Sequence, residues 1–162
     1  MDRWEEYFHA PSLKGRVTAR YMYEHLFLAH LYFEDMPQEE SGARPQQFFE
    51  LVRSRTPPGQ PIDRIATRRP FDDPGTRPYY RLRAVRESIV AKLHLPYALN
   101  DARMARWRSL FQDAPFTVSQ LPSYEPEVAS NPVVAFAQPP AASRYPFTLD
   151  DAPFTIMGFI NG

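Results

Sequence analysis

The stretch that most constrains the fold runs from residue 20 to residue 33. It is the most apolar run of useful length in the chain, yet it contains Glu24, His25 and His30. A helix that is apolar nearly all round has to be surrounded by protein rather than lie on a surface. We therefore predict a buried central helix over about residues 13–33.

The polar residues of this stretch point in different directions on a helix. His25 and His30 are five positions apart, which is a rotation of about 140° at 3.6 residues per turn. They cannot both ligate one metal ion from this helix. Each imidazole is either a functional group or a neutral core residue with a hydrogen-bonding partner. Glu24 has a possible partner one turn earlier in Arg20.

The rest of the chain predicts short strands and short helices separated by turns rich in proline. Three tight connections between strands contain Pro, which favours an antiparallel meander. The predicted strands cover residues 48–54, 62–67, 79–84, 88–95 and 133–137. The predicted helices cover residues 2–9 and 100–111, followed by two short helices after Pro139, the second capped by Asp151. The expected fold class is α+β, with the buried central helix packed on a small, mainly antiparallel sheet and flanked by short helices.

Composition limits the classes of protein that this chain can form. Hydrophobic residues make up 43% of the 162 residues and charged residues 23%, which is typical of a globular domain. This composition predicts a single domain over residues 1–162. The alternative is a fragment of a longer enzyme, because the apolar segment 154–160 lies close to the end of the chain. No signal peptide and no membrane-spanning run are recognisable. The chain has no Cys, so it can form neither a disulfide nor a thiolate metal site.

The positive charge is carried almost entirely by arginine. There are 17 Arg and 2 Lys, and nine of the Arg lie between Arg53 and Arg86. Arginine suits planar recognition of carboxylate and phosphate, although a GC-rich genome gives the same bias. The net charge is zero and no nucleic-acid-binding module is recognisable, so we predict no nucleic-acid partner. A third histidine, His94, ends a predicted strand, where binding residues often lie, or is a half-exposed edge residue.

Several runs, in this order and at this spacing, resemble the fatty acid cis/trans isomerase family of Gram-negative bacteria. The resemblance covers nearly the whole chain. The runs are residues 21–33, 51–61, 65–75, 79–82, 92–97, 143–145 and 154–160.

The resemblance implies a periplasmic enzyme that converts cis double bonds of membrane unsaturated fatty acids to trans. Members of the family carry haem c on a Cys-x-x-Cys-His motif, and an electron-poor iron would weaken the π bond so that it can rotate. This chain departs from the family pattern there, since it has no Cys. The haem is therefore expected outside this chain.

The hypothesis for the site is that this chain forms part of the pocket around an unsaturated fatty acid or a phospholipid acyl chain, near a membrane surface. The alternative is a module that binds a fatty acyl or anionic ligand without chemistry. The candidate catalytic residues are Glu24, His25, His30 and His94. The candidate acyl-chain wall consists of Tyr21, Tyr23, Phe27 and Phe33. The candidate ligands of the carboxylate or phosphate are Arg53, Arg68 and Arg69. We predict no metal site within the chain.

Overall fold

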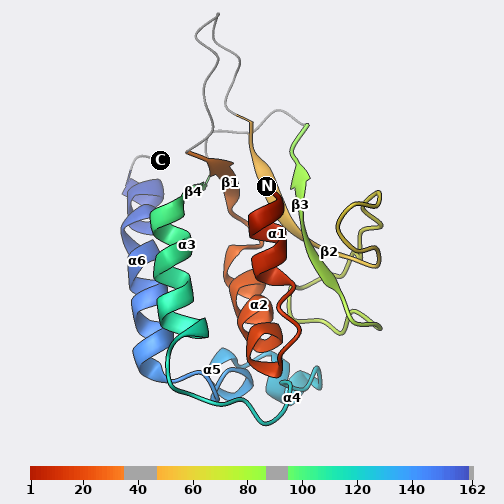
Figure 1. The fold of residues 1–162 in the computed structure, drawn as a ribbon, viewed down its shortest axis with the longest axis vertical. Helices are drawn as coiled ribbons and strands as arrows, with labels where there is room; N and C mark the ends of the chain where they lie inside the picture. Colours follow the sequence, from red (N-terminus) through yellow and green to blue (C-terminus); the bar gives the residue numbers. More distant parts are fainter. Residues whose placement is uncertain (35–46, 87–94, 161–162) are drawn as a thin grey trace, which may run out of the picture.

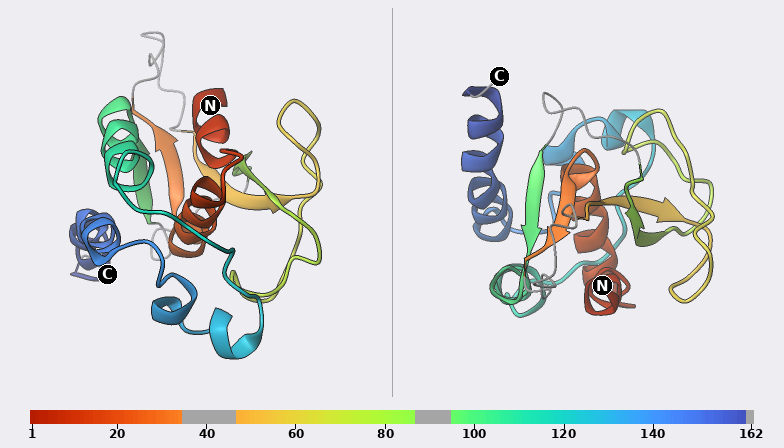
Figure 2. Two further views of the ribbon diagram at one scale, coloured as in Figure 1. Left: turned by 60° about the horizontal axis from the view of Figure 1, so that its bottom comes forward. Right: turned by 90° about the horizontal axis from the view of Figure 1, so that it is seen from above.

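The computed structural model describes residues 1–34, 47–86 and 95–160, with side chains up to residue 150. These residues form an α+β fold with a four-stranded mixed sheet. Figures 1 and 2 show α3 and α6 on one side of the molecule, α1 and α2 in the middle, and the connections 55–78 beside β2 and β3 on the other side. The helices are α1 (Asp2–Phe8), α2 (Leu13–Leu26), α3 (Asp101–Trp107), the π-helical turn η2 (Arg108–Gln112), α4 (Pro126–Ala129), α5 (Pro132–Ala135) and α6 (Ala141–Ile160). The strands are β1 (His30–Phe33), β2 (Phe49–Ser54), β3 (Tyr79–Ala84) and β4 (Pro96–Leu99).

The central helix α2 is confirmed in its first part, but the prediction that it continues to residue 33 is wrong. Ser12 caps it by accepting a hydrogen bond from the Gly15 N–H at 3.0 Å, which satisfies one of the donors left open at a helix start. The helix ends at Leu26, and the chain enters the sheet at His30. An aromatic-rich segment such as 30–33 fits a pleated strand well, and here it gains hydrogen-bonded neighbours on both sides.

β1 is an interior strand of the sheet, whose order is β3-β2-β1-β4. It pairs antiparallel with β2 through Leu31 and Phe49, and β2 pairs antiparallel with β3 along its whole length. The pairing of β1 with β4 is parallel, and the His30 N–H donates to the Leu95 carbonyl at 2.8 Å. The sheet is thus mainly antiparallel with one parallel edge, which the expected meander did not include.

Three further predictions of secondary structure are wrong, and one lies outside the described residues. Residues 62–67 form only an isolated bridge from Arg64 to Ser54. The expected strand 133–137 is the helix α5, because Asn131 caps Pro132, a residue suited to a first helical turn. The two expected short helices are the single helix α6, which runs through Pro146. Most of the expected strand 88–95 lies outside the described residues.

Aromatic side chains join the helices into one core. Trp107 of α3 is 1% exposed, and its ring lies 5.2 Å from Trp4 and 5.4 Å from Phe147. Phe147, which follows Pro146 in α6, is fully buried and also contacts Tyr21. Proline inside a helix costs about 3 kcal/mol or more of stability, because it lacks the backbone N–H that would donate a hydrogen bond. The burial of Phe147 offsets this cost at Pro146.

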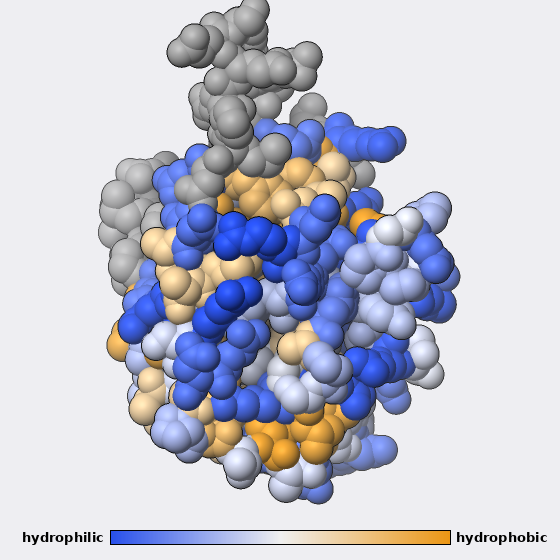
Figure 3. Space-filling model, in the orientation of Figure 1, coloured by the Kyte–Doolittle hydropathy of each residue, from blue (hydrophilic) through white to orange (hydrophobic). Residues whose placement is uncertain are grey.

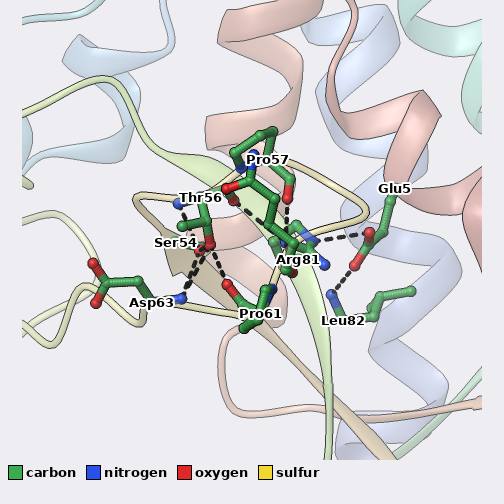
Figure 4. A network of polar contacts seen from close by, with 9 residues as sticks. Glu5, Ser54, Thr56, Pro57, Pro61, Asp63, Arg81 and Leu82 are labelled. Carbon is green, nitrogen blue, oxygen red and sulfur yellow. Dashed lines mark hydrogen bonds and ion pairs between the residues drawn. The ribbon is translucent and has the colours of Figure 1, made fainter.

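A buried ion pair holds α1 against β3 and the connection that follows β2 (Figure 4). Arg81 donates from Nε to Glu5 Oε2 at 2.9 Å, and the Leu82 N–H donates to Glu5 Oε1 at 2.9 Å. Nη1 of Arg81 donates to the carbonyl oxygen of Pro57 at 2.7 Å. Ser54 Oγ accepts a hydrogen bond from the Asp63 N–H at 3.2 Å. These contacts fix the start of the segment that carries the arginines of the site.

Candidate anion-binding site

Three segments meet in a hollow of about 340 Å³, which we call the arginine pocket. The end of α2 contributes aromatic side chains, β2 contributes Arg53, and the segment 64–70 contributes exposed cations. Five of the seven predicted substrate-binding residues line it, and sequence reasoning did not single out a sixth residue, Arg64. The lining residues that matter here are Tyr23, Phe27, Arg53, Arg64, Arg68 and Arg69.

The segment 64–70 is held beside the end of β2 by backbone hydrogen bonds. The Ile65 N–H donates to the Arg53 carbonyl at 2.8 Å, and the Arg55 N–H donates to the Asp63 carbonyl at 2.9 Å. Ile65 is buried, so its neighbour Arg64 faces away from the core and is exposed. The weak alternation of residues 62–67 was the signal that could have identified Arg64.

Arg53 is a buried cross-link rather than an open cation. It is 1% exposed, and it donates from Nη1 to the Asp72 carbonyl at 2.8 Å and from Nη2 to Thr67 Oγ1. Its guanidinium carbon lies 5.2 Å from the centre of the Tyr23 ring, a cation–π distance. Burial raises the pKa of Tyr23, and the positive charge of Arg53 opposes that rise. Arg53 therefore shapes the pocket wall and supplies positive charge from behind it.

The other arginines differ in how far their charge is already neutralised. Arg69 donates from Nε to Asp72 Oδ1 at 2.8 Å, and a hydrogen bond from the Arg69 backbone N–H lowers the pKa of Asp72. Arg64 and Arg68 make no side-chain hydrogen bond or ion pair within the described part of the chain. Glu50, the acidic residue of the lining, is paired with Arg83 at 2.7 Å. The pocket thus has uncompensated positive charge.

Three of the candidate catalytic residues, Glu24, His25 and His30, do not line this pocket. Nδ1 of His25 is hydrogen-bonded to the Tyr21 carbonyl at 2.8 Å, and the ring, which is partly exposed, packs on Tyr21 and Phe147. Partial burial lowers the pKa of His25. His30 lies in the sheet with its ring 6.3 Å from Phe48, and His94 lies outside the described residues.

Glu24 is paired with Arg20, as the helical spacing suggested. Arg20 donates from Nε to Glu24 Oε1 at 2.7 Å, and both side chains are buried. Burial raises the pKa of Glu24, while the hydrogen bond from Arg20 opposes that rise. Arg20 also donates to the Pro122 carbonyl at 2.7 Å and lies 3.7 Å above the Tyr124 ring. This pair fixes α2 against the loop 121–124.

Two residues of the predicted aromatic wall lie elsewhere. Tyr21 is in the core among Phe111, Phe136 and Phe147. Phe33 packs on Phe49 with ring centres 5.2 Å apart. Tyr23 and Phe27 are thus the members of the predicted wall that line the arginine pocket.

The described residues do not fit a haem group. The chain has no thiol for covalent attachment. His25 and His30 line neither the arginine pocket nor a second hollow, which has a volume of about 370 Å³. His9 does line the second hollow, but both of its ring nitrogens are buried. Within residues 1–34, 47–86 and 95–160 there is no cluster of three or more His, Asp or Glu that could hold a metal ion. No helix among the described residues has the length and apolar character needed to cross a membrane.

The chain thus combines an α+β fold with a hollow lined by arginines and aromatic rings, a lining whose chemistry suits an anion. The sequence model described as fatty acid cis/trans isomerase (CTI) matches residues 1–162, the whole chain, so this chain belongs to the fatty acid cis/trans isomerase family. No curated protein and no solved structure matches it.

Proposed function

We propose that this chain supplies the part of a fatty acid cis/trans isomerase that holds the acid end of an unsaturated fatty acid. The observation that carries the proposal is the arginine pocket, where Arg64 and Arg68 lie beside the rings of Tyr23 and Phe27 and have no counter-ion among the residues that the structure describes. A fatty acid has the matching chemistry, because a carboxylate adjoins an apolar chain. The family relationship supports a fatty acid as the ligand.

Binding at this pocket would position the acid without changing it. Guanidinium groups hold a carboxylate by planar, paired hydrogen bonds, and Tyr23 and Phe27 would pack against the first methylene groups. Arginine stays protonated at any physiological pH, so the anchor would not depend on pH near neutrality. The reaction requires rotation about a double bond, and fixing one end of the chain restricts where that bond can lie.

The cofactor of the catalytic step is assigned to another part of the enzyme. We propose that the haem is bound outside this chain, since the described residues do not fit it. The periplasm is the proposed compartment, following the family. His25, His30 and His94 stay candidates for contact with the reacting part of the molecule in the whole enzyme.

The membrane is the proposed source of the fatty acid or phospholipid. Figure 3 shows a hydrophobic area at the lower end of the molecule, the end where α4 and α5 lie in Figure 1. Val133 and Val134 of α5 are 68% and 50% exposed. We propose that this end contacts the bilayer. Val133→Asp should weaken co-sedimentation of the protein with phospholipid vesicles, whereas equal sedimentation would exclude this contact.

The alternative is a module that binds the fatty acid without taking part in isomerisation. One observation favours it, namely that none of the histidines in residues 1–34, 47–86 and 95–160 lines the arginine pocket. The two readings differ in the enzyme that contains this chain. If the chain holds the substrate, Arg68→Gln lowers the yield of trans fatty acid measured by gas chromatography. If it is only an accessory module, the yield stays the same.

Binding tests the proposal directly. A fluorescent fatty acid is displaced from the protein by a cis-monounsaturated C18 acid or by its methyl ester. Arg64→Gln and Arg68→Gln should each weaken acid binding by about tenfold, which corresponds to about 1.4 kcal/mol for one lost charged contact. The ester, which has no charge, should bind equally to all variants. Arg108→Gln is the control, because Arg108 is exposed and lines neither hollow. Equal acid binding by all variants would contradict the proposal.

A further inference from the structure

A second hollow is separated from the arginine pocket by the side chains of Tyr23 and Tyr80. It has a volume of about 370 Å³, and we call it the tyrosine pocket after Tyr79, Tyr80 and Tyr124. Tyr80 lines this hollow and Tyr23 lines the arginine pocket. The two rings lie 5.3 Å apart and are both buried, so they separate the two hollows.

Four separate parts of the chain build the tyrosine pocket. They are the end of α1, the first half of α2, the segment leading into β3, and the loop 121–124. The Arg20–Glu24 pair holds this loop in place, because Arg20 also donates to the Pro122 carbonyl. The hollow is therefore a built feature of the fold, with a volume in the range of about 300–1,000 Å³ that is usual for ligand sites.

The lining combines an apolar body with uncompensated positive charge. Phe8, Ala19 and Leu121 join the tyrosine rings in a mainly apolar surface. Arg16 from α2 and Arg77 from the segment before β3 make no side-chain hydrogen bond or ion pair within the described residues. The acidic residue of the lining, Asp73, accepts a hydrogen bond from the Gly75 N–H at 2.8 Å.

We propose that the tyrosine pocket is a second binding site, for a compact amphipathic carboxylate such as a short-chain or aromatic acid. Arg16 and Arg77 hold the carboxylate, and the apolar surface takes the body of the ligand. The site is distinct from the arginine pocket and does not depend on the function proposed for it. The ligand differs from a long fatty acid in being small enough to be enclosed by one hollow.

His9 provides a reporter inside this site. Its ring packs edge-on against Tyr79 with centres 5.5 Å apart. Burial lowers the pKa of His9; the carboxylate of Glu5 opposes this effect, while Arg81 and Arg77 reinforce it. A bound carboxylate near Arg77 would add negative charge and raise the pKa of His9 towards its ordinary value.

The test uses octanoate and 2-naphthoate as probes of the whole chain, with calorimetry for affinity and NMR for the histidine titration. Arg16→Gln and Arg77→Gln should each weaken binding by about ten- to a hundredfold, the range of one charged hydrogen bond. Saturating ligand should raise the pKa of His9 and leave that of His25 unchanged. Arg68→Gln, which alters only the arginine pocket, should bind both probes normally.

Three results would overturn the proposal. The first is unchanged affinity in the Arg16→Gln and Arg77→Gln variants. The second is acetate binding as tightly as octanoate, because the apolar surface would then contribute nothing. The third is loss of probe binding in Arg68→Gln alone, which would place the ligand in the arginine pocket and leave the function proposed for that pocket intact.

Discussion

Removing the charge of Glu5 should destabilise the protein strongly, because Arg81 would be left as a buried cation without a counter-ion. The two side chains are 6% and 8% exposed, and Glu5 also accepts the Leu82 N–H. Breaking a buried pair by removing one partner costs about 3–5 kcal/mol. That is a large share of the about 5–15 kcal/mol by which domains are stable. For a domain of this size the loss corresponds to a fall in Tm of about 6–20 °C.

The assay is urea unfolding of Glu5→Gln, followed by circular dichroism. A matched control is available in Arg3→Gln, because the Arg3–Asp101 pair has nearly the same length, 2.8 Å, but its side chains are 66% and 74% exposed. Exposed pairs contribute at most about 1 kcal/mol, so the control should change little. The double variant Glu5→Leu with Arg81→Met should recover much of the loss, since it leaves no unpaired charge. A loss below about 1 kcal/mol in Glu5→Gln would show that the Glu5–Arg81 pair contributes no more than an exposed pair.

Two further substitutions test the packing of α1 and α2. Gly15→Ala should lower the free energy of unfolding in urea by about 1 kcal/mol, because the added methyl would lie 2.4 Å from the Cβ of Ala10. This overpacking outweighs the gain in helix propensity. A stabilised variant would show that the start of α2 can shift. His9→Phe should reduce the acid sensitivity of folding. Both His9 ring nitrogens are buried and have no hydrogen-bonding partner among the described residues. Burial lowers the pKa of His9, so the folded state resists protonation. Stability is then lost as the pH falls below about 6.5, the unfolded value, until the folded pKa is reached. Unfolding at pH 7.5 and 5.5 should differ less in His9→Phe than in the unchanged protein, and an equal difference would exclude His9 as the cause.

Local signals predicted the elements that local interactions form. The range 79–84 for β3 is confirmed to the residue, and α2 begins at Leu13, where the central helix was predicted to begin. The transition from helix to strand before His30 could not be predicted in this way. It depends on the parallel pairing of β4 with β1, which joins residues about 65 positions apart. A local sequence pattern does not indicate that so long a loop will close. Hydrophobicity alone does not distinguish a buried helix from a buried strand over such a short run.

The composition of the arginine pocket could be predicted in part from residue type. The sequence made Tyr23 and Phe27 candidates for contact with an acyl chain, and it made the arginines candidates for binding a carboxylate. Both groups line the same hollow. The sequence could not indicate that Arg53 is occupied by Asp72 and Thr67, because that depends on how the connection 64–72 folds back. The tyrosine pocket joins four distant segments, so no spacing in the sequence indicated it.

The central claim is that the arginine pocket holds the acid end of an unsaturated fatty acid. The most direct test is a crystal structure of the protein with a cis-monounsaturated C18 acid. The carboxylate should lie within hydrogen-bonding distance of the Arg64 and Arg68 guanidinium groups, with the first methylenes against Tyr23 and Phe27. A carboxylate bound elsewhere, with the arginine pocket filled only by solvent, would contradict it.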